Sequence, residues 1–334
     1  MAELTVAAGL AKGLMRLAVS RGAPQAELLA RAGIDPGDLE DHDTRIPFSR
    51  YVALMRAGQA LAGDPALALH YGEERDFSEV SVVGLIGLAS ETMLEAFAQL
   101  NRYGRLVVEF DGPPDRFQLV REGEDLWMVD TRENANAFSE LTESTFAGMV
   151  CGPRRFGVSQ LVKAVQVTHP APAYRAEYER IFQAPVTFEG ARNAMLLDQR
   201  WIFHRMQLQP RYAFGILSRH ADALLASLEG AKTARGQVEA LLAPVLHTGQ
   251  ASMDAIAGKL GMSRPTLFRR LKAEGVTFEA VLDDLRRRMA LDYLGTRKVS
   301  VNETAYLVGF SEAAAFSRAF KRWTGKSPRE VRAG

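Results

Sequence analysis

Residues 253–272, MDAIAGKLGMSRPTLFRRLK, and residues 301–321, VNETAYLVGFSEAAAFSRAFK, repeat one pattern and decide the fold of the C-terminal part of the chain. In each copy a short apolar helix ends at a glycine, Gly261 or Gly309, and a serine two residues further on precedes a second helix. Glycine tolerates the left-handed backbone just past a helix end, and serine at an N-cap satisfies free backbone N–H groups. Each copy therefore predicts two helices joined by a tight turn.

The spacing of the two copies indicates an internal duplication. The two glycines are 48 residues apart, and so are Ser263 and Ser311. Beyond the turn the best match shifts to 49 residues, as between Arg269 and Arg318, so we expect the second turn to be one residue longer. A single pattern of this kind can be a plain helical hairpin, whereas a duplicated one in a basic region favours a pair of helix-turn-helix motifs.

One long helix is expected between the copies, because residues 278–294 carry apolar side chains at helical spacing. About seventeen residues form a rod of about 25 Å, which could hold two recognition helices about one turn of DNA, near 34 Å, apart. Ser300 with Glu303, and Ser327 with Glu330, have the spacing of capping boxes and mark further helix starts. The sequence therefore predicts an all-α domain with two helix-turn-helix motifs joined by a long linker helix.

The charge of the chain is divided between its two parts. Its 334 residues include 41 Lys and Arg and 40 Asp and Glu, a formal net charge of +1. Residues 231–334 hold 18 basic and 10 acidic residues, a net charge of +8, and residues 1–230 hold 23 and 30, a net charge of −7. Such asymmetry is typical of a polyanion-binding domain joined to another domain, although a solvated basic face would also produce it. We therefore expect a domain boundary at Gly230.

The duplicated region resembles AraC/XylS-type transcription regulators over about residues 237–332. The matching residues are Gly309-Phe310-Ser311-Glu312, Phe316-Ser317-Arg318-Ala319-Phe320-Lys321-Arg322, Gly325 and Ser327-Pro328 in the second copy, and Ile256-Ala257, Leu260-Gly261-Met262-Ser263, Leu267 and Arg269-Arg270-Leu271-Lys272 in the first. The resemblance implies a regulator that binds double-stranded DNA and, as an activator, works with RNA polymerase. One subunit would bind an asymmetric site, and a homodimer would add a second copy.

The exposed faces of the two recognition helices supply the residues expected to contact bases. In the first helix Leu267 and Leu271 are expected in the core, opposite that face. The expected base-reading residues are Pro265, Phe268, Arg269, Ala314, Ala315, Ser317 and Arg318. The two arginines occupy matching places, where each can donate two hydrogen bonds to guanine O6 and N7, worth about 1–3 kcal/mol of discrimination. The resemblance adds the apolar members, which could touch thymine methyl groups, and packing within the fold is the alternative for Phe268.

A second set of residues is expected to contact the DNA phosphates. Its members are Arg264, Thr266, Arg270, Lys272, Lys321 and Arg322. Arg270 could instead pair with an acidic neighbour within the fold. The three arginines at 286–288 lie on the linker helix, and we interpret them as a solvated or salt-bridged stripe rather than as base-reading residues.

Residues 1–230 predict an α+β domain. Helical patterns cover residues 4–20, 25–32, 47–61, 65–71, 93–103, 135–150, 174–182 and 211–228, and strand patterns cover 106–110, 117–121, 126–131, 161–168, 186–188 and 194–197. This half resembles the arabinose-binding-like N-terminal domain of AraC-type regulators of the ornithine-utilisation kind, through Pro47, residues 84–87 and residues 93–106 with the strands after them. The resemblance implies that the domain senses a small-molecule effector, without making arabinose that effector. The last helix is a core helix, or else a dimer or interdomain element.

An aromatic set could line the pocket for such an effector. It contains Tyr103, Phe110, Phe117, Trp127, Phe138 and Phe146, with Arg132, Glu133 or His204 as polar anchors. From this set we select Tyr103, Trp127, Arg132 and Phe138. An ordinary apolar core with surface ion pairs is the simpler interpretation of any one of them, and a partner protein could replace the small molecule altogether.

The sequence offers no support for an enzyme, a metal site or a membrane protein. It contains no P-loop, dinucleotide fingerprint, His-Glu-x-x-His or Gly-x-Ser-x-Gly motif, and its six His and one Cys lack zinc-ligand spacing. Cys151 lies in Val150-Cys151-Gly152-Pro153, unlike the Pro-Cys-His-Arg context of DNA-repair alkyltransferases with AraC-like domains. One cysteine and no apolar run of about 18–20 residues fit the cytoplasm. We therefore expect a cytoplasmic regulator without catalytic residues, cofactor or metal.

Overall fold

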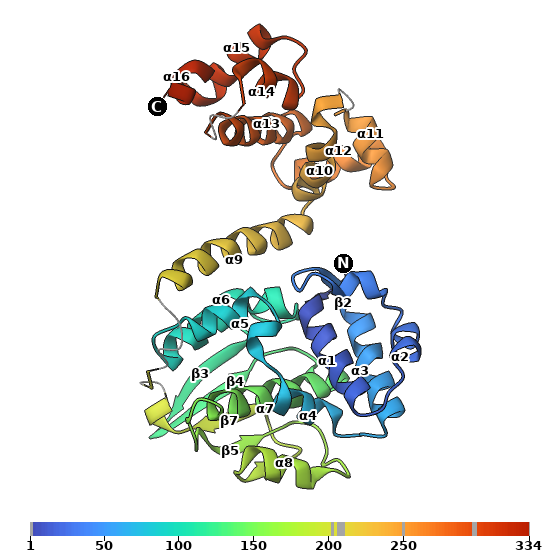
Figure 1. The fold of residues 1–334 in the computed structure, drawn as a ribbon, viewed down its shortest axis with the longest axis vertical. Coiled ribbons are helices and arrows are strands. Elements are labelled where there is room, and N and C mark those ends of the chain that lie inside the picture. The colour runs from blue at the N-terminus through green and yellow to red at the C-terminus, as the bar shows by residue number, and fades with distance from the viewer. Residues whose placement is uncertain (1–2, 202–203, 206–210, 249–250, 296–298, 334) are drawn as a thin grey trace. The chain divides into compact units, whose positions relative to one another are not determined.

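The computed structural model describes residues 3–201, 204–205, 211–248, 251–295 and 299–333 (Figure 1). The chain forms two compact units, Met1–Leu225 and Ala226–Gly334. The first contains helices and sheets and the second is helical, which is the α+β and all-α division that the sequence predicts. In the described part of the chain, no helix is both long and apolar enough to cross a membrane.

The first unit begins with a helical layer fastened by a short ribbon. Thr5–Ala7 (β1) pairs antiparallel with Arg45–Pro47 (β2), so that Val6 lies opposite Ile46, both of them buried. The layer consists of α1 (Ala8–Ser20), α2 (Gln25–Ala32), the 3₁₀ turn η1 (Pro36–Leu39), α3 (Phe48–Ala62) and α4 (Leu67–Glu74). Both α2 and α3 end at a glycine in the left-handed conformation, which glycine adopts without steric cost.

In the described part of the chain, a five-stranded sheet forms the middle of the first unit. Its strands are, in order across the sheet, β3 (Phe117–Glu122), β4 (Asp125–Asp130), β7 (Ala194–Leu197), β5 (Val162–Gln166) and β6 (Val186–Thr187). Neighbouring strands are antiparallel except for β5 and β6, which are parallel. Met195 on β7 lies opposite both Met128 and Val165, and all three are buried, so the core lies against the central strands.

Helices pack against this sheet and against one another. They are α5 (Val82–Leu88), α6 (Met93–Val107), α7 (Glu140–Arg154) and α8 (Arg175–Phe182). Ser81 and Thr92 cap α5 and α6 by accepting backbone N–H bonds of 3.2 and 3.1 Å. The helices α4 and α7 approach each other closely at Gly72, where a Cβ would collide with the carbonyl oxygen of Ser144. Glycine is therefore required at this crossing.

Two of the predicted helices have different starts. Residues 5–7 form a strand, because Val6 gains a buried partner across the ribbon, and the helix predicted over 4–20 starts only at Ala8. Residues 135–138 form a separate 3₁₀ turn (η3, Ala135–Phe138) before α7 begins at Glu140. The prediction of a single helix over 135–150 is wrong at that end.

The strand predicted over residues 106–110 is also wrong. The helix α6 continues to Val107, and Val108 forms an isolated bridge with Val6. Arg45 stabilises this helix end by donating hydrogen bonds to the carbonyl oxygens of Leu106 and Arg105. The partner lies about sixty residues away in the chain, so the local pattern could not reveal it.

The second unit contains the duplicated helices. The helix α9 (Arg211–Ala231) leads into it from the first unit. The elements that follow are α10 (Ala234–Leu242), the 3₁₀ turn η5 (Ala243–Thr248), α11 (Met253–Lys259), α12 (Arg264–Ala273), α13 (Phe278–Gly295), α14 (Val301–Leu307), α15 (Ala313–Thr324) and α16 (Pro328–Ala333). Because α14 begins 48 residues after α11 and α15 begins 49 residues after α12, the predicted duplication and the longer second turn are confirmed.

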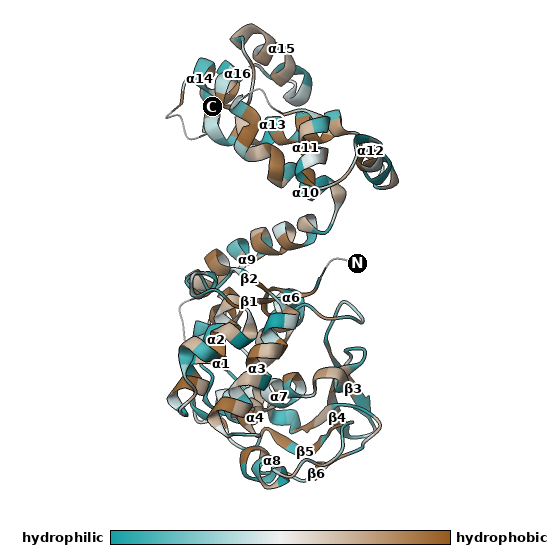
Figure 2. Ribbon diagram, turned by 90° about the vertical axis from the view of Figure 1, so that its right-hand side faces the viewer, coloured by the Kyte–Doolittle hydropathy of each residue, from teal (hydrophilic) through white to brown (hydrophobic). Residues whose placement is uncertain are grey.

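The linker helix α13 belongs to two apolar cores. Its first half places Val281 and Leu285 in a core with α10, α11 and α12. Its second half places Ala290 and Leu294 in a core with α14 and α15. Figure 2 shows apolar residues, in brown, along α10 and α13. Each helix-turn-helix motif therefore has its own core, and one continuous helix connects them.

Two helix starts in the second unit have the expected capping boxes, and two expected serine caps do not form. Ser263 occupies the N-cap position of α12, but its side chain makes no capping bond and its hydroxyl oxygen lies 2.9 Å from that of Thr266. Ser300 and Glu303 form the predicted capping box with bonds of 3.1 and 2.8 Å, and Ser327 begins a second one. Ser311 does not cap α15, because Glu312 occupies the N-cap position and its side chain makes no capping bond. The additional residue in the second turn moves the helix start past Ser311.

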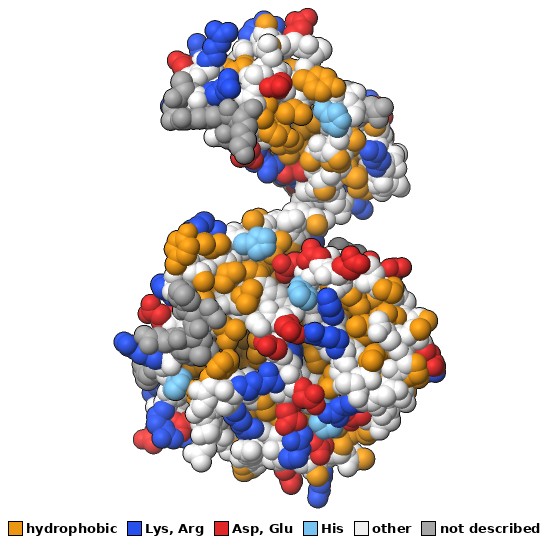
Figure 3. All heavy atoms as spheres, in the orientation of Figure 1, with side chains coloured by type: hydrophobic (Ala, Val, Ile, Leu, Met, Phe, Trp, Pro, Cys, Tyr) orange, Lys and Arg blue, Asp and Glu red, His pale blue; other side chains and the backbone are white. Residues whose placement is uncertain are grey.

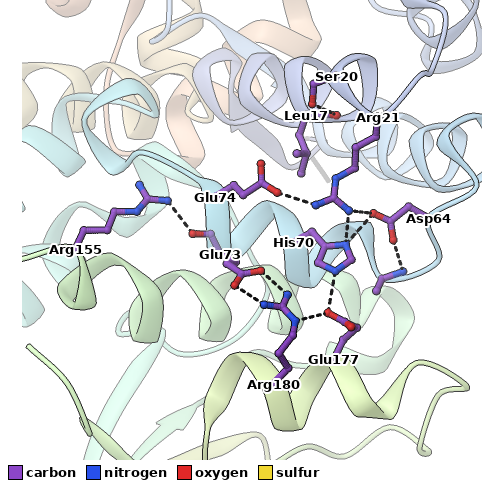
Figure 4. A network of polar contacts seen from close by, with 11 residues as sticks. Leu17, Ser20, Arg21, Asp64, His70, Glu73, Glu74, Arg155, Glu177 and Arg180 are labelled. Atoms are coloured by element: carbon purple, nitrogen blue, oxygen red, sulfur yellow. Dashed lines mark hydrogen bonds and ion pairs between the residues drawn. The ribbon is translucent and has the colours of Figure 1, made fainter.

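A network of ion pairs ties the end of α1 to α4 and α8 (Figure 4). Arg21 binds Asp64 at 2.5 Å, and the same carboxylate lies 2.8 Å from His70. The other ring nitrogen of His70 lies 3.0 Å from Glu177, which pairs with Arg180 at 2.8 Å. Figure 3 shows side chains of both charges intermixed on this face of the first unit.

Glu143 on α7 is a buried carboxyl group with tyrosine partners. The hydroxyl groups of Tyr178 and Tyr174 donate to its Oε1 at 2.6 and 2.9 Å, and its Oε2 has no hydrogen-bond partner among the described residues. Burial raises the pKa of Glu143 to about 7 from an ordinary value of 4.5. The native state therefore binds this proton more tightly than the unfolded state does, and stability falls as the pH rises from about 4.5 through 7.

We expect Glu143→Gln to raise the melting temperature at pH 8, where the wild-type carboxylate is ionised in a buried site. The amide keeps an acceptor oxygen for both tyrosines, and the gain is up to about 3 kcal/mol. Calorimetric melting temperatures between pH 5 and 8 measure this, and the difference should shrink toward pH 5. Glu179→Gln, an exposed change on α8, is the control. If both variants showed the same pH trend, the buried carboxyl group of Glu143 would not be its cause.

Candidate nucleic-acid interface and ligand cavity

The first recognition helix, α12, presents its predicted face at the surface. Leu267 and Leu271 are buried in the core, whereas Pro265, Phe268 and Arg269 are exposed. The ring of Phe268 keeps 52% of its surface exposed and lines a shallow hollow together with the other two exposed residues. An exposed phenyl ring beside an arginine can contact a thymine methyl group while the arginine contacts a neighbouring base.

The second recognition helix, α15, repeats this geometry with smaller side chains. Phe316 and Phe320 are buried, Ala314 and Arg318 are exposed, and Ala315 is half-buried. Its N-terminal part therefore has a low surface of methyl groups with one long cation beside it. Such a surface admits a close approach of the helix to base edges.

The two matching arginines keep donors available for a ligand. The Nε of Arg269 lies 3.4 Å from the Pro265 carbonyl oxygen, and Arg318 has no hydrogen bond or ion pair with another described residue. Ser317 differs, because its hydroxyl group donates to the Ala313 carbonyl oxygen at 2.8 Å. Only the oxygen lone pairs of this serine are left to accept a hydrogen bond from a base.

Three of the residues expected at phosphates are unpaired cations. Arg270, Lys272 and Lys321 are exposed and make no ion pair with any residue that the structure describes. The internal partner considered for Arg270 is therefore not found among those residues. Cations that have no carboxylate partner attract a polyanion without competition.

The other expected phosphate contacts have partners in the structure. Arg264 pairs with Asp254 and Arg322 pairs with Asp283, each at 3.1 Å and with both side chains well exposed. Exposed pairs of this kind are worth only about 0–1 kcal/mol, so a phosphate can replace the carboxylate at low cost. Thr266 is half-buried, and its hydroxyl oxygen lies 2.9 Å from the hydroxyl oxygen of Ser263.

The arginines at 286–288 have structural partners. Arg286 is half-buried and donates to the carbonyl oxygens of Val308 and Gly309 at 3.1 and 3.4 Å, with its guanidinium over the Phe310 ring. Burial lowers its pKa. Arg287 and Arg288 form ion pairs with acidic residues of α10 and α13. Arg286 therefore holds the second motif against the linker helix, whereas Arg287 and Arg288 pair within α13 and with α10.

The first unit contains an apolar cavity of about 260 Å³. Its walls come from α5, α6, α7 and the sheet, with Phe97 and Leu100 on α6 and Met128 and Met195 on the strands. Phe156 also lines it and keeps 51% of its surface exposed, so the cavity reaches the surface near that ring. A concave, mainly apolar cavity with a few polar groups is the usual form of a small-molecule site.

The polar groups of this cavity lie in the segment after α4 and on neighbouring elements. Arg75, Arg116 and Arg155 line it, with Asp76 as the acidic residue among the described lining residues. Arg75 is 9% exposed and its Nε has no hydrogen-bond partner among the described residues. The sequence analysis names none of these four residues, because a single charged residue in a charged stretch resembles an ordinary surface residue.

None of the four residues selected from the sequence as effector contacts lines this cavity. Tyr103 is buried and its hydroxyl group donates to Asp222 at 2.7 Å, and Trp127 lies under the Arg192 guanidinium. Arg132 pairs with buried Asp130 at 3.0 Å. Phe138 packs edge-on against Phe48 and Tyr51. The structure places these residues in separate packing and ion-pair roles, whereas Phe117 from the wider aromatic set does line the cavity.

Cys151 has no features of a reactive thiol. It is buried in α7, and burial raises its pKa. A thiol reacts as its thiolate, so a raised pKa leaves it unreactive at neutral pH. The packing role is consistent with the sequence context, which differs from that of DNA-repair alkyltransferases.

Two family models match the chain. The model described as the arabinose-binding domain of AraC transcription regulators, N-terminal, matches residues 22–206, and a helix-turn-helix domain model matches residues 256–334. The chain belongs to the AraC family of transcription regulators. It is therefore a DNA-binding helix-turn-helix regulator with an N-terminal domain of the arabinose-binding type.

Several known regulators match nearly the whole chain. The ornithine utilization regulator of Pseudomonas aeruginosa is 29% identical over 99% of this chain and 97% of its own length. The regulator VirS of Mycobacterium tuberculosis is 26% identical over 93% of this chain and 92% of its own. The crystal structure of the regulator CdpR from P. aeruginosa is 23% identical, with a TM-score of 0.40 over 92% of this chain and 96% of that one.

The turn glycines of this AraC-family regulator differ in their surroundings. Gly261 has φ 65° and open space where a Cβ would lie. Gly309 has φ 82°, and a Cβ there would collide with the carbonyl oxygen of Leu246 in η5. A side chain at either glycine is disfavoured by the positive φ angle. At Gly309 it would also collide with the Leu246 carbonyl oxygen.

We expect Gly261→Ala to lower the free energy of unfolding by about 1–2 kcal/mol. Gly309→Ala should lower it by more and should also weaken DNA binding, because the second motif must move away from η5. Urea unfolding and a DNA-binding titration on the two variants measure both effects. Equal losses of stability would show that the collision at Leu246 has no influence on the fold.

Proposed function

We propose that this AraC-family regulator is an activator that responds to a small-molecule effector bound in the cavity of its first unit. Its DNA contacts are made by α12 and α15, one in each of two successive major grooves. The observation that carries the DNA part is the matched pair Arg269 and Arg318, each exposed on a helix whose opposite face is buried. An arginine with free donors at the same place in each motif is the side chain best suited to read guanine.

The proposed contacts divide into two classes with different physical signatures. Base contacts from Pro265, Phe268, Ala314, Ala315 and Ser317 complete the readout of the two arginines. Phosphate contacts from Lys272, Lys321 and the neighbouring cations add affinity that is independent of sequence and falls with salt. The excess of positive charge in residues 231–334 supports this division.

The first unit supports a small molecule better than a partner protein. A cavity of about 260 Å³ with apolar walls and buried arginines has the size and chemistry of a metabolite site. An effector bound there would lie among α5, α6 and α7. As an activator the protein would act on RNA polymerase in the cytoplasm, and a homodimer would place two copies of the DNA-binding unit on one promoter.

We expect Arg269→Ala and Arg318→Ala each to lower specific promoter affinity by about 1–3 kcal/mol and to relax the sequence preference at one position. Lys272→Ala is the contrasting variant, because it should weaken specific and non-specific binding alike and reduce the slope of log K against log salt by about 0.9. Titrations against promoter and random duplexes at several salt concentrations measure these quantities. Retention of full specificity by both arginine variants would overturn the readout.

Arg288→Ala is the matched control for the arginine variants. Its guanidinium group is engaged with Glu239 on α10 and with Asp284 on the linker helix, so its loss should leave base preference unchanged. A metabolite screen by thermal shift on the full chain tests the sensor part. If no compound raises the melting temperature, the partner-protein alternative replaces the effector.

A further inference from the structure

Arg75 is a buried cation without an anion. It follows α4, and no Asp or Glu lies within ion-pair distance among the described residues. Its Nη2 reaches the Ser144 carbonyl oxygen at 3.4 Å, and its Nε has no hydrogen-bond partner in that part of the chain. The guanidinium lies over the rings of Tyr71 and Phe77, at 5.3 and 4.8 Å from their centroids. A charge buried in this way is costly unless something pairs with it.

The surroundings hold Arg75 in one place. Gly148 on α7 makes room for it, since a Cβ there would come within 2.6 Å of Nη2. Arg155 donates to the carbonyl oxygens of Arg75 and Glu73 at 3.1 and 2.7 Å, which fixes the backbone at the end of α4. The guanidinium is therefore pre-organised at the cavity wall, which lowers the entropic cost of binding a partner.

The charge around this end of the cavity is positive. Asp76 is the acid among the described lining residues, and its carboxylate accepts hydrogen bonds from the hydroxyl group and the backbone N–H of Ser78, which lower its pKa. Arg116 shares the single carboxylate of Asp130 with Arg132. With Arg75 and Arg155 added, the cations exceed the acids nearby. This balance attracts an anionic ligand and repels a cationic one.

The rest of the cavity accepts an apolar body. Val83, Met93, Phe97 and Leu100 line it from α5 and α6. A volume of about 260 Å³, at roughly 30 Å³ for each water molecule in the liquid, has room for a compact molecule of on the order of ten non-hydrogen atoms. Apolar surface removed from water here contributes about 25 cal/mol per Å² to binding.

Two glycines face this space. Gly87 on α5 and Gly104 on α6 both line the cavity, and a Cβ on either would touch nothing within 4 Å. Both have ordinary helical backbone angles, since neither is among the residues with positive φ. A larger side chain at Gly104 would therefore occupy the cavity, while the helix would gain from the loss of a glycine.

We infer that the cavity binds a small monocarboxylate with an apolar body, its carboxylate paired with Arg75 and its body between α5, α6 and α7. The inference rests on the proposed effector role of the first unit. A carboxylate can accept two hydrogen bonds from one guanidinium group, so it would supply the anion that this buried charge lacks among the described residues. A neutral ligand would leave the buried charge unpaired, and an amine would add to the positive charge.

The experiment is calorimetric titration of the full chain with matched probes. Straight-chain and aromatic monocarboxylates of roughly 8 to 12 non-hydrogen atoms, octanoate among them, are compared with octan-1-ol and octylamine. We expect at least one carboxylate to bind, and the alcohol and the amine to bind at least tenfold more weakly than octanoate. Failure of every carboxylate to bind, or equal binding of octanoate and octylamine, would overturn the inference.

Three variants locate the binding. Arg75→Gln should weaken carboxylate binding at least tenfold, and Gly104→Leu should abolish binding of every probe. Arg192→Gln removes an arginine that stacks on Trp127 and pairs with Glu122 outside the cavity, so it should leave binding unchanged. Carboxylate binding that survives both of the first two changes belongs elsewhere on the protein and contradicts the site.

The stability of the unliganded protein separates binding from a structural role. If Arg75 is kept for a ligand, Arg75→Gln should leave the melting temperature unchanged or raise it, because a buried unpaired charge is removed. A loss of several degrees that Arg75→Lys restores would show that the cation holds the fold, and the inference would fail. Gly104→Leu still reports on the cavity if Arg75→Gln does not fold.

The results also separate the carboxylate assignment from the effector role of the first unit. If octylamine or another non-acidic compound binds and Gly104→Leu blocks it, the cavity is an effector site and only the carboxylate assignment fails. If no compound binds, the effector role falls as well. The DNA contacts are independent of both results, because they depend on Arg269 and Arg318 in the other unit.

Discussion

The second unit depends on the sharing of α13 between two apolar cores. Val281 and Leu285 pack with the first helix-turn-helix motif, and Ala290 and Leu294 pack with the second. A continuous helix turns by a fixed angle at each residue, so the positions of these four side chains set the orientation of α12 relative to α15. Arg286 strengthens the coupling through its bonds to the turn of the second motif. One chain thereby carries two recognition helices as a single body, which separate domains on a flexible linker could not do.

The sequence predicts this unit well because the forces that shape it are local. A glycine with positive φ, a capping box and apolar residues at helical spacing act within one or two turns of the chain, and each leaves a pattern that can be read directly. The exception has the same cause. Ser311 has the chemistry of a cap and aligns with Ser263, the N-cap residue of the first copy, but the second turn is one residue longer and the helix starts after Glu312. The residue type was right for a cap and the position was wrong.

The first unit is less predictable because its decisive contacts are distant in sequence. The end of α6 is stabilised by Arg45, from a strand about sixty residues earlier, and no local pattern contains that partner. The cavity likewise gathers residues from Leu10 to Trp201. Aromatic residue type alone does not identify its lining, because some aromatic side chains, such as Phe97 and Trp201, line the cavity and others pack in the core away from it. Tyr103 and Phe138 are examples, each buried with partners of its own.

The net charge of a unit reflects the charges that a ligand would meet better in the second unit than in the first. In the second unit the basic excess lies partly on exposed, unpaired side chains such as Arg270 and Lys272, so the sum over the residues is a fair measure of its attraction for a polyanion. In the first unit the sum is acidic, yet one end of its cavity is basic, because Asp130 is shared by two arginines and Arg75 pairs with no carboxylate of the described residues. Surface acids are screened by water and salt, whereas buried charges are not. The net charge of an acidic domain therefore says less about its cavity than the pairing of its few buried charges does.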